Sequence, residues 1–338
     1  MRPYRFLSRP LTAAALSALA VLPAAVPAVA DSGTPPAFTI EDPRIRESSG
    51  LAASRVHPGV YWTHNDSDDG PYVYAVDSRT GRTVARVTLA GITPRDVEAI
   101  SIGPDGNVYV GDIGDNLGGS WPQVWIYRFP EPKTLKDTTV TPVRYTVRYE
   151  DGPRDAESLM VHPKTGRVYL VSKKRSGKGA LYAGPENLSA SGTNTFRRVA
   201  DINVWATDGA FSPDGTRLVV RGYFNAREYR WENGLPKEIG SPGVPFQGQG
   251  ESVTFTPDGR TLMYGSEGKR SSVQPIALEG ELLPEQAAKA PDDSKGGGPA
   301  APESEGGGDR NRNLFVGAAV LAAAVVLVTG LRKLVRRK

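Results

Sequence analysis

The stretch Phe211-Ser212-Pro213-Asp214-Gly215 decides the fold, because turns of this kind recur along the chain. Each turn follows a small or acidic residue and an apolar alternation, and each precedes a short β-rich run. The five copies start 43 to 59 residues apart, at Ser49, Glu98, Glu157, Asp208 and Glu251. Alternating apolar runs joined by such turns indicate β-hairpins, and hairpins at this period are typical of propeller blades.

Residues 36–281 are therefore predicted to form an all-β domain, a β-propeller. Five copies favour five blades, and a sixth, degenerate blade within the long interval 98–157 is the alternative. The run Phe38-Thr39-Ile40 precedes the first copy, while the last copy is short of its outer strand. We expect this N-terminal strand to close the ring by pairing in the last blade.

The two ends of the chain resemble targeting segments. Residues 1–30 have the basic start, apolar stretch and Ala-x-Ala end of a signal peptide. Residues 314–331 form an apolar run long enough for a transmembrane helix, and the basic residues 332–338 follow it. Residues 282–313 are rich in Gly, Pro, Ala and acidic residues, which predicts a flexible linker. The expected location is the cell membrane, crossed once, with the propeller extracellular and a cytoplasmic C-terminal tail.

Composition excludes several classes of function. The chain has no cysteine and three histidines, so it offers no disulfide framework and no thiolate or His-rich metal site. The net charge of +4 comes from the ends, because without eight terminal Arg and Lys residues 33 basic residues face 37 acidic ones. A nucleic-acid binder needs a basic face, so we expect no nucleic-acid partner.

One residue at the start of each copy is expected to face the central channel: Ser49, Glu98, Glu157, Asp208 and Glu251. Four carboxylates converging on one axis repel one another unless a cation lies among them. Oxygen ligands of this kind suit Ca²⁺, which predicts an axial calcium site. The alternative is structural, with each carboxylate accepting backbone N–H bonds from the neighbouring blade.

The Phe-Ser-Pro-Asp-Gly turn, together with Glu98-Ala99-Ile100 and Glu157-Ser158-Leu159, resembles secreted actinobacterial propellers of unassigned activity. The ring of channel residues is similar to that of calcium-dependent nucleotidases (apyrases), which are five-bladed and place Ser and Glu around calcium. This resemblance implies calcium ligands at Ser49, Glu98, Glu157 and Glu251. Asp208 departs from the pattern, because that family has Ser there.

A second polar set follows the second strands of the hairpins and predicts a ligand-binding face: His64, Asp66, Asp112, Asp115, Lys173, Arg175, Arg221 and Glu267. Ordinary solvated loops are the alternative explanation. The sequence contains no nucleophile elbow, zinc-protease pair or phosphate-binding loop. The favoured function is a cell-surface module that binds an unknown extracellular ligand or protein, with an axial Ca²⁺. The alternative is an extracellular calcium-dependent phosphoester hydrolase, apyrase-like or phytase-like.

Overall fold

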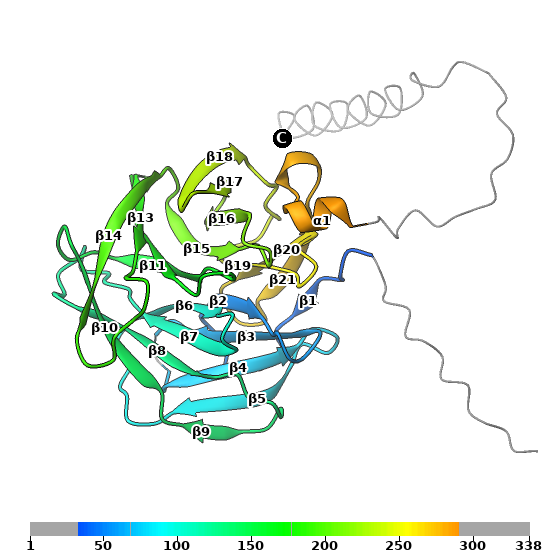
Figure 1. Ribbon diagram of the computed structural model, residues 1–338. Helices are drawn as coiled ribbons and strands as arrows, with labels where there is room; N and C mark the ends of the chain where they lie inside the picture. Colours follow the sequence, from blue (N-terminus) through cyan, green and yellow to red (C-terminus); the bar gives the residue numbers. More distant parts are fainter. Residues whose placement is uncertain (1–32, 68, 177, 291–338) are drawn as a thin grey trace, which may run out of the picture. The chain divides into compact units, whose positions relative to one another are not determined.

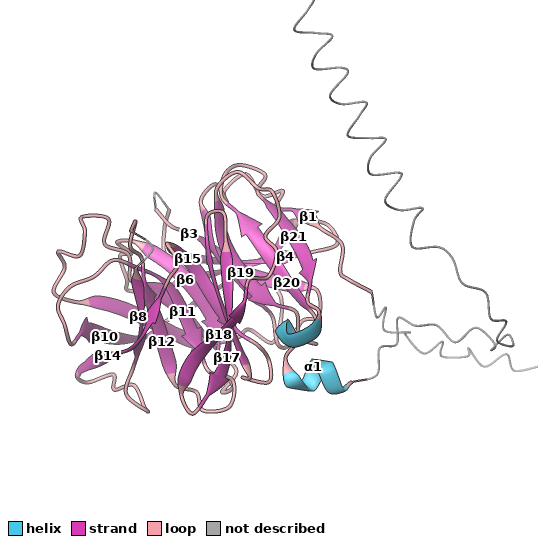
Figure 2. Cartoon of the chain, turned by 90° about the horizontal axis from the view of Figure 1, so that it is seen from above, coloured by secondary structure: helices cyan, strands magenta, loops and turns pink. Residues whose placement is uncertain are grey.

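The computed structural model describes residues 33–67, 69–176 and 178–290. The predicted signal peptide, transmembrane segment and basic tail lie outside these residues. Within them, no helix combines the length and apolar character needed to cross a membrane. Figure 2 shows strands throughout this part of the chain, with two short helical segments. The predicted all-β, propeller-like fold is confirmed.

The described strands build antiparallel meanders of four strands each. The first two are β2 (Ser48–Ala53), β3 (Val60–Asn65), β4 (Tyr72–Asp77) and β5 (Arg82–Leu89), then β6 (Val97–Ile102), β7 (Asn107–Asp112), β8 (Val124–Pro130) and β10 (Val143–Tyr149). The third is β11 (Ala156–Val161), β12 (Val168–Ser172), β13 (Gly179–Ala183) and β14 (Thr193–Ile202). The fourth is β15 (Ala206–Phe211), β16 (Arg217–Gly222), β17 (Ala226–Glu232) and β18 (Leu235–Gly240). The last is β19 (Gly250–Phe255), β20 (Thr261–Ser266), β21 (Ser272–Ala277) and β1 (Phe38–Thr39).

The first strands of the meanders form a closed circle. β2 contacts β6, β6 contacts β11, β11 contacts β15, β15 contacts β19, and β19 returns to β2. Figure 1 shows these strands gathered at the centre, with β5, β9, β14 and β18 at the periphery. Radial sheets around a shared axis are the arrangement of a propeller.

The N-terminal strand closes this circle, as the sequence predicts. β1 pairs antiparallel with β21, and Phe38 lies opposite Val273. The ring of Phe38 packs at 5.5 Å from that of Tyr61, which belongs to the first meander. The closing strand therefore joins the last meander by hydrogen bonds and the first one by apolar contact.

The long interval 98–157 adds a strand to an existing sheet. β9 (Thr138–Val140) pairs in parallel with β5, the outer strand of the first meander. A second parallel pairing, between β10 and β14, joins the second and third meanders at their outer edges. Among the described residues, the interval thus adds no further meander beyond the second one, which it contains.

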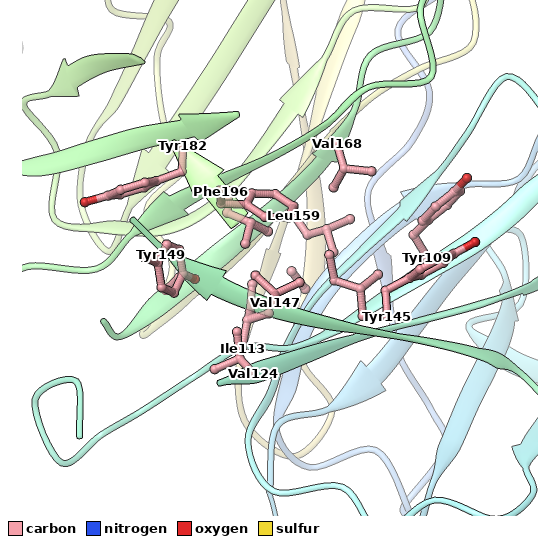
Figure 3. Packing of buried hydrophobic residues seen from close by; sticks show 14 of the residues in the cluster. Tyr109, Ile113, Val124, Tyr145, Val147, Tyr149, Leu159, Val168, Tyr182 and Phe196 are labelled. Carbon is pink, nitrogen blue, oxygen red and sulfur yellow. The ribbon is translucent and has the colours of Figure 1, made fainter. Parts of the chain in front are cut away.

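The core consists of apolar clusters, each lying between two neighbouring meanders. Figure 3 shows the cluster between the second and third meanders, where Tyr149 and Tyr182 pack edge to face with ring centroids 5.0 Å apart. Burial is complete or nearly so for Leu159 and Phe196 in the same cluster. These side chains come from alternate positions along each strand, the pattern from which the sheets were predicted.

Residues 282–290 differ from the prediction of a flexible linker. They include the end of η1 (Gly280–Leu282) and the helix α1 (Glu285–Lys289). The Arg260 guanidinium donates to the carbonyl oxygens of Ala287 and Ala290, at 2.9 Å each, and the Gln286 N–H donates to Asp214 Oδ2 at 2.9 Å. The folded body therefore extends to about residue 290, and the rest of the predicted linker lies outside the described residues.

Candidate functional site

Every first strand carries a β-bulge near its start, so that one residue has no partner on the second strand. The bulged residues are Ser49, Glu98, Glu157, Thr207 and Glu251. A bulge redirects the extra side chain away from the regular alternation of the strand. Four of the five predicted ring residues therefore occupy equivalent positions, and the fourth meander places Thr207 there instead of Asp208.

The assignment of Asp208 to the ring is wrong by one residue. Asp208 is buried beside the bulge, where Oδ2 accepts the Val253 N–H at 2.8 Å and Oδ1 accepts its neighbour's N–H. Asp208 thus bonds β15 to β19, which is the structural role considered as the alternative. The Thr207 hydroxyl donates to the Gly250 carbonyl at 3.0 Å.

A sequence signal for Thr207 exists in the spacing to the turn proline. Six residues separate Glu98 from Pro104 and Glu251 from Pro257, and six also separate Thr207 from Pro213. Aligning the last four copies on proline gives a hydroxyl in the fourth copy and a carboxylate in the other three, whereas Ser49 lies nine positions before Pro58.

A cavity of about 170 Å³ opens at this end of the circle of first strands. Four bulged residues line it, Ser49, Glu98, Glu157 and Glu251. The other lining residues come from adjoining loops and strand ends: Glu47, Asp66, Asn116, Lys173, Tyr223, Gln249 and Glu267. The described lining residues thus include six carboxyl groups and one ammonium group, a strong excess of negative charge when ionised.

Lys173 supplies the positive charge among the converging carboxyl groups. Its Nζ forms an ion pair with Glu157 Oε1, and both side chains are largely buried. Burial opposes the charge of Lys173, but attraction and hydrogen bonding by Glu157 outweigh burial and raise the pKa of the lysine. Part of the repulsion that led to the calcium hypothesis is therefore relieved by the chain itself.

The remaining carboxyl groups are left without a full countercharge. Burial, followed by the negative charge of Glu157, raises the pKa of Glu98 well above its usual range. Burial likewise raises the pKa of Glu251 to about 7 and that of Asp66 to about 6. Without a further cation, the cavity therefore retains protons near neutral pH.

The ring residues are joined to one another and to their neighbours. The Ser49 hydroxyl donates to Glu98 Oε2 at 3.0 Å, linking the first and second meanders. Gln249 Nε2 donates to Glu251 Oε1 at 2.6 Å. By contrast, Glu157 Oε2 is buried and has no hydrogen-bond partner among the described residues. A buried carboxylate oxygen left unpaired is costly, so this atom is available to a ligand that enters the cavity.

The donor set has the chemistry of a calcium site but not its closed geometry. Carboxylate and hydroxyl oxygens are the ligands that Ca²⁺ prefers. In the described part of the chain, no three Asp, Glu or His side chains lie close enough together to hold a metal ion as they stand. Lys173 occupies one oxygen of Glu157, so calcium would have to compete with this ammonium group.

Of the predicted ligand-binding face, Asp66, Lys173 and Glu267 line the cavity. His64 is buried, and its Nδ1 lies 3.1 Å from the Asn65 carbonyl oxygen. Asp112 accepts the Asp96 N–H and the Tyr127 hydroxyl, both at 2.9 Å, which makes it a structural residue.

The other predicted members do not reach the cavity either. Asp115 caps its own loop by accepting the Trp121 N–H at 2.6 Å. Arg221 is buried and donates to the carbonyls of Ser252 and Gly265, at 2.9 Å each. The Arg175 guanidinium lies over the Trp205 ring, 5.5 Å from its centroid. From residue type alone, these residues with local structural roles could not be distinguished from the residues that line the cavity.

Sequence reasoning missed Glu47 and Gln249, whereas Asn116 and Tyr223 stood beside Asp115 and Arg221 in the predicted polar set. Glu47 and Gln249 lie two residues before Ser49 and Glu251, just ahead of β2 and β19, and both line the cavity. Asp96 holds the equivalent position before Glu98 and accepts a hydrogen bond from Asn116 Nδ2 at 3.2 Å. The recurring polar residue two positions before the ring residue was a usable signal for Glu47 and Gln249.

Comparisons with known proteins extend the description of the fold only. No protein-family model and no curated protein matches the chain. Among solved structures, Kuenenia stuttgartiensis hydrazine synthase is 16% identical, with a TM-score of 0.36, over 64% of this chain and 61% of that one. U3-55K is 10% identical, with a TM-score of 0.38, over 72% of this chain and 98% of that one. The RRP9 WD40 repeats are 14% identical, with a TM-score of 0.36, over 69% of this chain and 67% of that one.

The chain spans less than two thirds of the hydrazine synthase chain that it matches. These similarities are too distant to carry an argument about activity or partners. The account of function therefore depends on the cavity.

Proposed function

We propose that this protein is a binding module, a five-bladed propeller whose acidic cavity takes a divalent cation, Ca²⁺, and marks the ligand-binding end. The observation that carries the proposal is the cavity itself, which is lined by six carboxyl groups and one lysine. The number five is supported by the closed circle of first strands and by the cluster of apolar residues between each neighbouring pair. The N-terminal and C-terminal segments support display of this module on the outer surface of a membrane.

Charge balance is the physical reason for a cation. Lys173 compensates one carboxylate, and the others reduce their repulsion by keeping protons, as the raised pKa values of Glu98 and Glu251 indicate. A divalent cation replaces those protons and bonds to the unpaired Glu157 Oε2. Ser49, Glu98, Glu157 and Glu251 would hold the ion, and Thr207 stays bonded to the backbone. Bound calcium would supply positive charge and link four blades.

Binding is favoured over phosphoester hydrolysis because of where the basic residues lie. A hydrolase needs several cations around the phosphate, and Arg221 and Arg175 are engaged elsewhere. Lys173 is the one basic residue among the described residues that line the cavity. A panel of nucleotides, phytate and aryl phosphates, assayed with and without Ca²⁺, tests the hydrolase alternative directly.

The test of the cation site is thermal unfolding of the full chain near neutral pH, first in EDTA and then in millimolar CaCl₂. A ligand that binds only the native state raises the midpoint, by about 2.7 kcal/mol of stability at a hundredfold excess over Kd. We expect a rise for the natural protein and none for Glu157→Gln. Glu186→Gln is the matched control, because Glu186 is exposed on the third meander, far along the chain from the ring. Equal rises for natural protein and Glu157→Gln would refute the site.

A further inference from the structure

A second, larger cavity of about 430 Å³ lies at the opposite ends of the same first strands. The strands that contribute carboxyl groups at their starts contribute apolar residues at their ends. Every meander takes part through strand residues and turn prolines: Leu51, Ala53 and Pro58, Ile100 and Ile102, Val161 and Pro163, Ala210, Phe211 and Pro213, and Phe255 and Pro257. Ligand sites in proteins have this range of volume and are mostly apolar, with a few polar groups.

The walls of this apolar cavity are fixed by the fold. Leu51, Ile100, Val161 and Phe255 are almost fully buried. The serine hydroxyl groups in the lining are used within the protein, since Ser54 Oγ donates to Glu131 Oε1 at 2.6 Å. Ser212 Oγ likewise donates to Asp214 Oδ1 at 2.7 Å, and Ser101 Oγ accepts the Val161 N–H at 3.2 Å. Because these hydroxyl groups are already bonded, the rest of the lining is mainly apolar, and the interior of the cavity favours the apolar part of a ligand.

Arg55 is the one charged residue among the described residues that line this cavity. Its guanidinium group forms no hydrogen bond or ion pair within the described part of the chain, and the residue is accessible at the rim. The nearby carboxylate of Glu131 is already used, because its oxygens accept Ser54 Oγ, Trp62 Nε1 and the Arg55 backbone N–H. Burial of part of the side chain lowers the pKa of Arg55, and the more distant charges of Glu131 and Asp105 only partly offset this effect.

We propose that this cavity binds a small amphipathic carboxylate, with its apolar body against the ends of the first strands and its carboxylate on the Arg55 guanidinium. A guanidinium group matches a carboxylate through two parallel hydrogen bonds. The apolar lining excludes a strongly hydrated anion that lacks an apolar body, since such a ligand would lose water without compensation. This site is distinct from the acidic cavity and does not require calcium.

The proposal is tested by calorimetric titration of the full chain with three compounds that share one apolar body: octanoate, 1-octanol and octylammonium. We expect octanoate to bind about tenfold more tightly than 1-octanol, which is the effect of one charge-assisted interaction, and octylammonium to bind most weakly. In Arg55→Gln, the affinity for octanoate should fall to that for 1-octanol. Arg82→Gln, an exposed arginine on β5 of the same meander, should leave all three affinities unchanged.

A second variant checks the apolar part of the site. Ala53→Phe places a ring into the cavity from a partly buried position, and we expect it to weaken octanoate and 1-octanol alike. Equal affinities for the three compounds, or an unchanged affinity for octanoate in Arg55→Gln, would overturn the proposal. Binding of a peptide that ends in an apolar residue, with no binding of octanoate, would also overturn it and would assign the cavity to a protein partner.

Discussion

Replacement of Lys173 by methionine tests the electrostatics of the acidic cavity directly. Methionine keeps much of the length and apolar surface of lysine but removes the charge that faces Glu157. In the natural protein the two side chains are 14% and 2% exposed, so the pair is largely withdrawn from water. Removing one partner of such a pair typically costs about 3–5 kcal/mol, because the other charge stays buried without compensation.

The cost depends on pH in a defined direction. Burial raises the pKa of Glu157 well above its usual range even with Lys173 present, and losing the lysine raises it further. In the variant the Glu157 carboxyl group therefore stays protonated at pH 5, and in this neutral form it repels the other carboxyl groups of the cavity little. At pH 8 the folded variant must either ionise Glu157 or hold a proton that the unfolded chain releases. We expect a small destabilisation at pH 5 and the full effect at pH 8.

The assay is thermal unfolding in EDTA at both pH values, followed by addition of CaCl₂ at pH 8. A loss of ~3–5 kcal/mol lowers the midpoint by roughly 6–20 °C for a body of this size. Calcium should restore more of the midpoint in the variant than in the natural protein, because Lys173 no longer competes for Glu157. Lys174→Met, at the exposed neighbouring position, is the control. Equal midpoints for the two variants at pH 8 would refute the reasoning.

Three further outcomes follow from the structure. Burial raises the pKa of Glu251 to about 7 from 4.5, so without calcium the folded state binds more protons than the unfolded chain between these pH values. The free energy of unfolding should therefore fall by up to about 3 kcal/mol as pH rises through this window. Denaturant titrations from pH 4 to pH 8 measure this fall. Asp208→Ala leaves the Val253 N–H unpaired and should cost about 1–3 kcal/mol, yet the calcium-induced rise in midpoint should persist, because Asp208 lies outside the ring. Deleting residues 33–41 removes β1, so the exposed edge of β21 should promote aggregation, measurable by light scattering at a concentration where the full body stays monodisperse.

The sequence predicted the features that depend on periodicity. Alternation and recurring turns identified the hairpins, and an unpaired apolar run before the first copy identified β1 as the closing strand. The same periodicity located Glu98, Glu157 and Glu251 correctly at one end of the ring of first strands.

The errors came from local geometry that a repeat alignment does not contain. Asp208 has the expected residue type, but the bulge assigns the ring position to Thr207 and leaves Asp208 to bond the backbone. Arg221 follows the same pattern, because its carbonyl partners lie on strands far away in the sequence. Lys173 was assigned to a ligand face, and its partner Glu157 emerged only when strand and loop were placed together.

The pairing of β1 with β21 has a consequence for how the molecule is made. The partners are almost the whole length of the body apart, and the Arg270–Glu41 ion pair beside them spans 229 residues. Phe38 and Ile40 are synthesised before the rest of the folded body, yet their binding site exists only after the last strands have been produced. Ring closure is therefore a late, non-local step, and contacts of this kind fold slowly. Until that step the apolar start of the body stays uncovered, so a chaperone that holds this segment would control the yield of folded protein.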